Sequence, residues 1–122
     1  MYNKKIMPTY IGIGFITDFD FLYNIGNKLK INKYNVLNEK NKIIEFLKKE
    51  YNLKNIFILY NSNIYDIAVF SNILQIADPF CSIEKLNNNY DIPENFEEMK
   101  EKIAPDKDIK MIAYYTNEKI TI

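Results

Sequence analysis

The segment from Leu53 to Ile76 constrains the fold of this chain most, because it is the longest stretch of dense apolar sequence. Residues 56–60 form an apolar run of strand length, and a second run spans residues 64–70. The Asn-Ser-Asn tripeptide at 61–63 separates them, and small polar residues between two β-rich runs are typical of a hairpin turn. The first run lacks strict alternation, so we expect its strand to be covered on both faces and to lie centrally in the sheet.

Residues 8–16 alternate between the two faces of an extended chain and predict a first strand. Gly12 and Gly14 lie on one face of that strand and leave its backbone bare. Another element can approach closely there. We expect that element to be a packed helix, with a ligand as the alternative.

Two amphipathic helices are predicted between the first strand and the central segment, because the apolar period changes there to that of a helix. The first spans about residues 18–30 and the second about residues 39–51. Thr17 and Asn38 precede them and are the expected N-caps, since short polar side chains accept hydrogen bonds from the first free backbone N–H groups.

The sequence after the central segment mixes helix and strand signals. Residues 71–78 are expected to be a helix capped by Ser71 or an irregular segment, and residues 94–104 a third amphipathic helix. Residues 109–116 and 119–122 predict a closing hairpin. Strands that arrive as hairpins with helices between them predict one α+β domain over residues 1–122, with a largely antiparallel sheet and two to four helices packed on it.

The composition excludes several classes of function. The chain has 122 residues, sixteen acidic and sixteen basic, and every basic residue is Lys. Without Arg there is no planar fork for bidentate guanine contacts, so sequence-specific DNA binding is disfavoured. Without His the chain lacks Ser-His triads and His-rich zinc sites, and we expect no cofactor.

Cellular context is also suggested by the composition. A single cysteine, Cys81, excludes an internal disulfide and fits a reducing compartment. No apolar run is long enough to span a membrane, so we expect a cytoplasmic protein that binds no membrane. Heavy use of Ile, Asn, Lys and Tyr reflects AT-rich codons and suggests a low-GC bacterium or its phage.

Two carboxylates, Asp18 and Asp20, follow the first apolar strand. This DxD spacing resembles that of small nucleotidyltransferases and of haloacid-dehalogenase-type phosphatases, which hold Mg²⁺ against a phosphate. The chain lacks the Gly-Ser turn that precedes the first pattern and has Phe21-Leu22 where the second needs Gly-Thr, so it is assigned to neither family. Asp66 is the candidate third ligand, and helix capping is the other explanation of the pair.

Tyrosines are the main candidates for partner binding, because Tyr offers large contact area with few rotatable bonds. Ten Tyr and eight Phe are present, and Tyr60, Tyr65 and Tyr90 are among the tyrosines close to turns and edges. The closing hairpin adds the adjacent pair Tyr114 and Tyr115, which should point to opposite faces. Its last strand contributes two apolar residues, Ile120 and Ile122. We expect docking or homodimer formation through this hairpin, either by strand addition or through the face that carries the exposed Tyr.

The acidic segment 91–101 is the second candidate surface. Glu94, Glu97, Glu98 and Glu101 stand there with Lys100 as the only basic residue. A negative face could meet a basic partner, such as the nucleic-acid channel of a nuclease. A solvated helix face is the simpler interpretation.

These observations predict a small, non-enzymatic protein that acts by occupying a protein partner, such as a nuclease, toxin or defence protein. It would be an inhibitor, an immunity protein or an anti-defence protein. The alternative is a divalent-metal-dependent phosphoryl- or nucleotidyl-transfer enzyme that uses Asp18 and Asp20.

Overall fold

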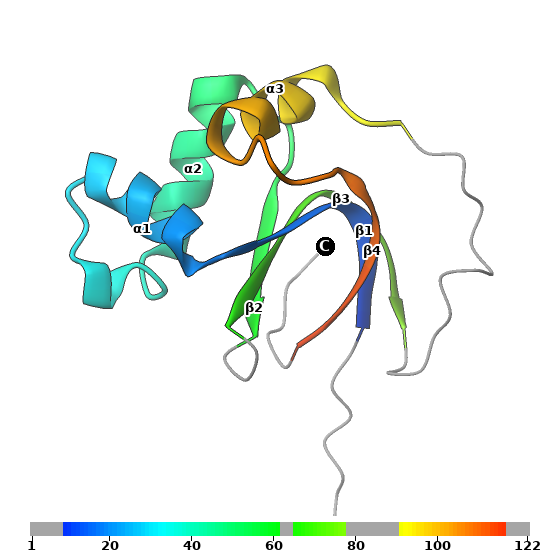
Figure 1. Ribbon diagram of the computed structural model, residues 1–122, viewed down its shortest axis with the longest axis horizontal. Helices are drawn as coiled ribbons and strands as arrows, with labels where there is room; N and C mark the ends of the chain where they lie inside the picture. The colour runs from blue at the N-terminus through cyan, green and yellow to red at the C-terminus, as the bar shows by residue number, and fades with distance from the viewer. Residues whose placement is uncertain (1–8, 62–64, 78–90, 117–122) are drawn as a thin grey trace, which may run out of the picture.

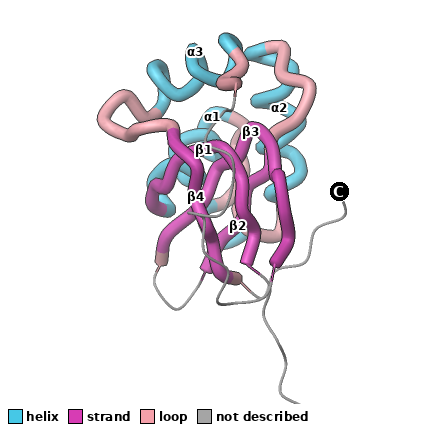
Figure 2. Tube along the Cα trace, turned by 90° about the vertical axis from the view of Figure 1, so that its right-hand side faces the viewer, coloured by secondary structure: helices cyan, strands magenta, loops and turns pink. Residues whose placement is uncertain are grey.

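The computed structural model describes residues 9–61, 65–77 and 91–116. Within these ranges the chain forms an α+β domain in which one antiparallel sheet carries three α-helices. The helices lie on one side of the curved sheet (Figures 1 and 2). The elements, in chain order, are β1 (Thr9–Asp18), α1 (Phe19–Lys28), the 3₁₀ helix η1 (Lys33–Asn35), α2 (Lys40–Tyr51), β2 (Phe57–Asn61), β3 (Asp66–Ala77), α3 (Glu94–Ile103) and β4 (Lys110–Tyr115).

The four strands lie in the order β2-β3-β1-β4, and every neighbouring pair is antiparallel. The predicted central hairpin is confirmed as β2 and β3. The predicted central position of its first strand is wrong, because β2 lies at one edge of the sheet that the described strands form, and β1 and β3 are central. The first run resembled a central strand because Ile58 and Leu59 are both buried, one beneath the helices and one on the opposite face.

Strand β1, which contains Gly12 and Gly14, bends sharply (Figure 1). The register between β1 and β3 shifts twice there, and such bulges increase the bend of a strand. A Cβ on Gly12 would collide with the carbonyl oxygen of Asn72, and one on Gly14 with that of Val69. The element that approaches the bare backbone is therefore strand β3, and the expected packed helix is a wrong interpretation.

Bending gives the sheet two separate cores. Between the sheet and the helices, Phe15, Ile58, Ile67 and Val69 pack against helix residues such as Phe96. On the opposite, concave face the core comprises Tyr10, Leu59, Ala68, Phe70, Ile73, Ile112 and Tyr114. A helical layer covers one face, and the curl of the sheet closes the other.

The curl brings the end of β4 against the tip of the β2–β3 hairpin, although the two edge strands are not neighbours in the sheet. Thr116 Oγ1 donates to the Tyr60 carbonyl oxygen at 2.8 Å, and Asn61 Nδ2 donates to the Tyr115 carbonyl oxygen at 2.9 Å. Tyr114 on β4 donates its hydroxyl proton to Asp66 at the start of β3, whose Oδ1 lies 2.7 Å away. These bonds fix the curl.

Residues 71–77 form the second half of strand β3, so the predicted helix or irregular segment at 71–78 is wrong over this range. Ser71 does not cap a helix: its hydroxyl donates to the Ile13 carbonyl oxygen at 3.1 Å. This hydroxyl lies at the second register shift, between the pairs Ile13–Asn72 and Gly14–Phe70. The sequence has no alternating pattern here because bulges interrupt the strand.

The helix caps differ from the prediction by one residue. Thr17 is buried in β1, and Asp18 caps α1 by accepting from the Asp20 backbone N–H at 3.1 Å. Glu39, rather than Asn38, precedes α2 and makes no side-chain cap bond. The third helix is confirmed, with Phe96, Met99 and Lys100 on its buried side. The closing strand 119–122 lies outside the described residues.

Candidate functional site

Four aromatic rings from three parts of the chain meet beside the tip of the β2–β3 hairpin. Phe19 is at their centre, and its ring centroid lies 6.3 Å from that of Tyr23, 6.4 Å from that of Tyr60 and 6.2 Å from that of Tyr65. The Tyr23 ring is stacked on Phe19 with an interplanar angle of 26°, and the other two meet it edge-on at 62° and 66°. Offset stacked and edge-to-face arrangements are those that aromatic quadrupoles favour.

The local sequence places these rings in a simple way. Phe19 and Tyr23 are separated by four positions in α1, so they lie on one side of the helix. Tyr60 stands near the end of β2. Tyr65 closes the hairpin in the left-handed conformation, with φ of 52°, and donates its backbone N–H to the Asn61 carbonyl oxygen at 2.9 Å. The helix and the hairpin are thereby held together by aromatic contacts at their ends.

Two lysines lie over these rings. Lys33 Nζ is 5.3 Å from the centroid of the Tyr23 ring, and Lys40 Nζ is 6.0 Å from that of Tyr60. Both distances fall within the range in which an ammonium group is attracted to the negative face of a ring. Burial lowers the pKa of Lys40 from 10.5 to about 8. We call Phe19, Tyr23, Lys33, Lys40, Tyr60 and Tyr65 the aromatic–lysine face.

Lys33 and Tyr65 of this face are exposed, and its other four members are half-buried. Tyr65 is 71% exposed, and Tyr34, next to Lys33 in the short helix η1, is 88% exposed. Tyrosines are favoured as anchors in protein interfaces. The arrangement combines apolar contact area with fixed positive charge and can therefore recognise a partner surface.

The predicted hairpin site is only partly described. Tyr114 and Tyr115 do lie on opposite faces, as expected: Tyr114 is buried, and Tyr115 is 43% exposed. Burial and the bond to Asp66 raise the pKa of Tyr114 well above its usual range, so its hydroxyl stays protonated. Tyr114 serves the concave core and cannot anchor a partner. Ile120 and Ile122 lie outside the described residues.

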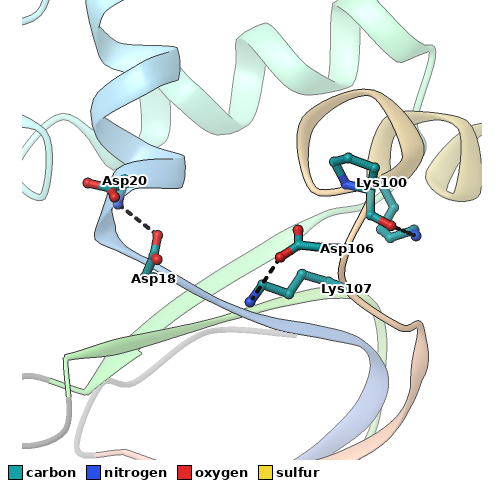
Figure 3. A network of polar contacts seen from close by, with 6 residues as sticks. Asp18, Asp20, Lys100, Asp106 and Lys107 are labelled. Atoms are coloured by element: carbon teal, nitrogen blue, oxygen red, sulfur yellow. Dashed lines mark hydrogen bonds and ion pairs between the residues drawn. The ribbon is translucent and has the colours of Figure 1, made fainter.

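The acidic segment forms the outer side of α3, where Glu94, Glu97, Glu98 and Glu101 are exposed. Lys100 points the other way and is buried, with its Nζ 2.6 Å from Glu101 Oε1 and donating to the Pro105 carbonyl oxygen at 3.3 Å. Figure 3 shows this lysine at the end of α3. The four glutamates thus share one exposed side, while the lysine fastens the helix to the turn that follows.

The three candidate metal ligands do not form one cluster. Asp18 and Asp66 are opposite each other in the β1–β3 register, but Asp66 accepts the Tyr114 hydroxyl. Asp18 accepts the Asp20 backbone N–H (Figure 3). Within residues 9–61, 65–77 and 91–116, no three His, Cys, Asp or Glu side chains gather as a metal site.

A cleft of about 680 Å³ opens between the end of α2, the middle of β3 and the start of α3. Its lining includes Asn52, Asn55, Asn72 and Asn95. Asn95 Nδ2 donates to the Asn52 carbonyl oxygen at 3.0 Å. Asn52 itself ends α2 in the left-handed conformation. The cleft marks the junction at which the two helices are fastened.

Comparison with known proteins gives no assignment: no known family matches the chain, and no curated protein or solved structure matches it. Among the helices in the described part of the chain, none has the length and apolar character needed to cross a membrane.

Sequence reasoning found part of the aromatic–lysine face. Tyr60 and Tyr65 were predicted as candidates from their places near a turn. Phe19, Tyr23 and the two lysines were missed, because the helix containing Phe19 was analysed only for its apolar side. The four-residue spacing of Phe19 and Tyr23 was the available signal, together with the lysines at 27–42.

Proposed function

We propose that this is a non-enzymatic binding protein that acts by occupying a protein partner through the aromatic–lysine face. In this proposal it works in the cytoplasm as an inhibitor, an immunity protein or an anti-defence protein. The observation that carries the proposal is the convergence of four rings and two lysines from α1, η1, α2 and the β2–β3 hairpin. Tyrosine-centred patches of this kind often supply most of the energy of an interface.

The ring contacts also support a preformed binding surface. Binding loses less free energy to ordering when the side chains already hold their positions. Phe19 contacts three rings at once, so Tyr23 and Tyr60 are positioned before any partner arrives. Tyr65 remains mostly exposed and can enter a pocket on the partner.

The test is to identify the protein that cross-links to the tagged full chain in its host and then measure binding of the purified pair by calorimetry. Truncating Tyr65 to Ser should weaken binding by about 2 kcal/mol or more, as for a central interface tyrosine. Tyr115→Ser, an exposed tyrosine on β4, is the matched control and should change it little. Full binding by the Tyr65 variant, with loss in the Tyr115 variant, would move the interface to the closing hairpin.

A further inference from the structure

The charges of this neutral chain are separated along its sequence. Residues 27–42 hold five lysines and one acidic residue, Glu39. Five lysines against one acidic residue give this segment a net positive charge, and the acidic residue, Glu39, lies 2.7 Å from Lys42. Residues 91–108 show the reverse, with seven acidic residues against three lysines. In Figure 1 the connection between α1 and α2 lies away from α3, so the two charges occupy different parts of the surface.

The positive charge is concentrated where the aromatic rings are. Lys33 and Lys40 lie over Tyr23 and Tyr60, and the rings limit the positions that their ammonium groups adopt. A lysine that is already positioned loses less side-chain entropy when it meets an anion. Burial lowers the pKa of Lys40. A carboxylate that a partner brings close to Lys40 would act in the opposite direction, because an opposite charge favours the charged amine.

The anion could be a carboxylate surface or a single-stranded nucleic acid, and ring geometry separates the two. Nucleic acids bind such patches by stacking bases on open ring faces. Here Tyr23 is stacked on Phe19 and has Lys33 over its ring, and Tyr60 has Lys40 over its ring. The Tyr23 and Tyr60 rings therefore do not form a continuous stacking platform with Tyr65, whereas ammonium groups beside an exposed tyrosine suit carboxylates on a protein.

We propose that the aromatic–lysine face recognises an acidic protein surface, with Lys33 and Lys40 pairing with carboxylates around the Tyr65 anchor. This inference rests on the proposed function, because it names the chemistry of the partner that the same face would occupy. It also assigns the acidic side of α3 no part in that contact.

The test uses an oligo-L-glutamate peptide and an oligothymidylate of equal net charge, each titrated into the isotope-labelled full chain and followed by amide NMR shifts. We expect the peptide to shift amides at Lys33, Lys40 and Tyr65, and added salt to weaken it. Lys33→Gln with Lys40→Gln should weaken peptide binding at least about tenfold. Lys54→Gln with Lys102→Gln, which removes the same charge elsewhere, should not.

Several results would overturn the inference. Absence of peptide binding, shifts confined to other surfaces, or equal weakening in both double variants would each do so. Tighter binding of the oligothymidylate at the same residues would replace it with nucleic-acid binding.

The purified partner separates this inference from the proposed function. If Tyr65→Ser abolishes partner binding and the Lys33 and Lys40 changes do not, the charges of these two lysines do not contribute to partner binding. In that case only the inference fails. If neither variant affects partner binding, the proposed function fails as well.

Discussion

The acidic side of α3 and the aromatic–lysine face are both charged and exposed, but they are built differently. On α3 the glutamates lie on the outside of a helix whose inner side, with Phe96 and Met99, packs into the core. On the aromatic–lysine face the lysines rest on rings, and those rings contact Phe19. The acidic side of α3 is the solvent-exposed side of a helix that packs into the core. The aromatic–lysine face is held in a defined geometry by contacts among its own side chains.

This difference shows why sequence charge alone is a weak guide to a binding surface. The run of glutamates is more conspicuous in the sequence, yet an exposed charge on a long side chain contributes little once entropy and screening are counted. The positions of Lys33 and Lys40 become meaningful only when the fold brings Tyr23 and Tyr60 beneath them. Mutations that distinguish buried residues from exposed ones on each surface therefore test whether the acidic side of α3 and the aromatic–lysine face differ in this way.

The largest effect should come from the inner side of α3. Phe96 is fully buried and packs 5.8 Å, between ring centroids, from Phe15. Phe96→Ala should lower the free energy of unfolding by about 3–5 kcal/mol through lost burial and the cavity left behind. Glu97→Gln, the next residue but exposed, should change it by less than about 0.5 kcal/mol. Urea unfolding measures both, and a large effect of Glu97→Gln would show that the acidic side has a structural partner.

The next effect concerns Phe19, which joins the rings of the aromatic–lysine face. Phe19→Leu keeps much of the apolar burial but removes three ring pairs, each worth about 0.5–1.5 kcal/mol. We expect a loss of about 1–3 kcal/mol in unfolding free energy. Tyr34→Ala, at an 88% exposed ring, should cost less than about 0.5 kcal/mol. Equal and small effects at both positions would mean that the face is not preformed.

The fold was predictable wherever one face of an element was apolar and the other polar. The α+β class, the central hairpin and the third helix followed from such patterns, and Ile58, Ile67 and Val69 of that hairpin are buried. Residues 71–77 were misassigned because a bulged strand inside a bent sheet has no regular alternation. Gly12 and Gly14 indicated that another element lies close to the backbone of β1. Which element this is depends on how the strands pair in the folded protein.

The candidate site was less predictable, because its members are brought together only by the fold. Tyr65 was recognisable as a tyrosine beside a turn. Its contact with Phe19, over forty residues earlier in the chain, depends on how α1 packs beside the hairpin. The cation–ring pairs depend in the same way on where η1 and the start of α2 are placed.

A third charged site lies at the start of α1, and changes there should lower the free energy of unfolding less than Phe19→Leu does. Asp18 caps the helix, so Asp18→Ala should cost about 0.5–2 kcal/mol and Asp18→Asn only a few tenths. Titration with Mg²⁺ or Mn²⁺ should leave the melting temperature unchanged. A metal-dependent rise in melting temperature that is lost in the Asp18→Asn, Asp20→Asn double variant would instead favour the metal-enzyme alternative. The aromatic–lysine face would then not be the main functional surface.

The smallest effect is the pH dependence caused by Lys40, because its amine is partly exposed and solvent screens it. The folded chain releases this proton at about pH 8, whereas the unfolded chain keeps it to about pH 10.5. Between these values the unfolded state binds more protons, so the unfolding free energy should rise with pH. Above pH 10 the trend should reverse, since the raised pKa of Tyr114 keeps its proton in the folded state while the unfolded tyrosine loses it.

Lys40→Met tests this assignment, because it removes the titrating group and keeps an unbranched side chain over the Tyr60 ring. The rise between about pH 8 and pH 10 should disappear in this variant, and the wild type should be the less stable protein below pH 8, where its folded state holds a desolvated charge. Lys102→Met, on the exposed side of α3, should retain the wild-type profile. Loss of the rise in the Lys102 variant, or its persistence in the Lys40 variant, would mean that burial of Lys40 does not cause the rise, and the lysines of the two surfaces would then be equivalent.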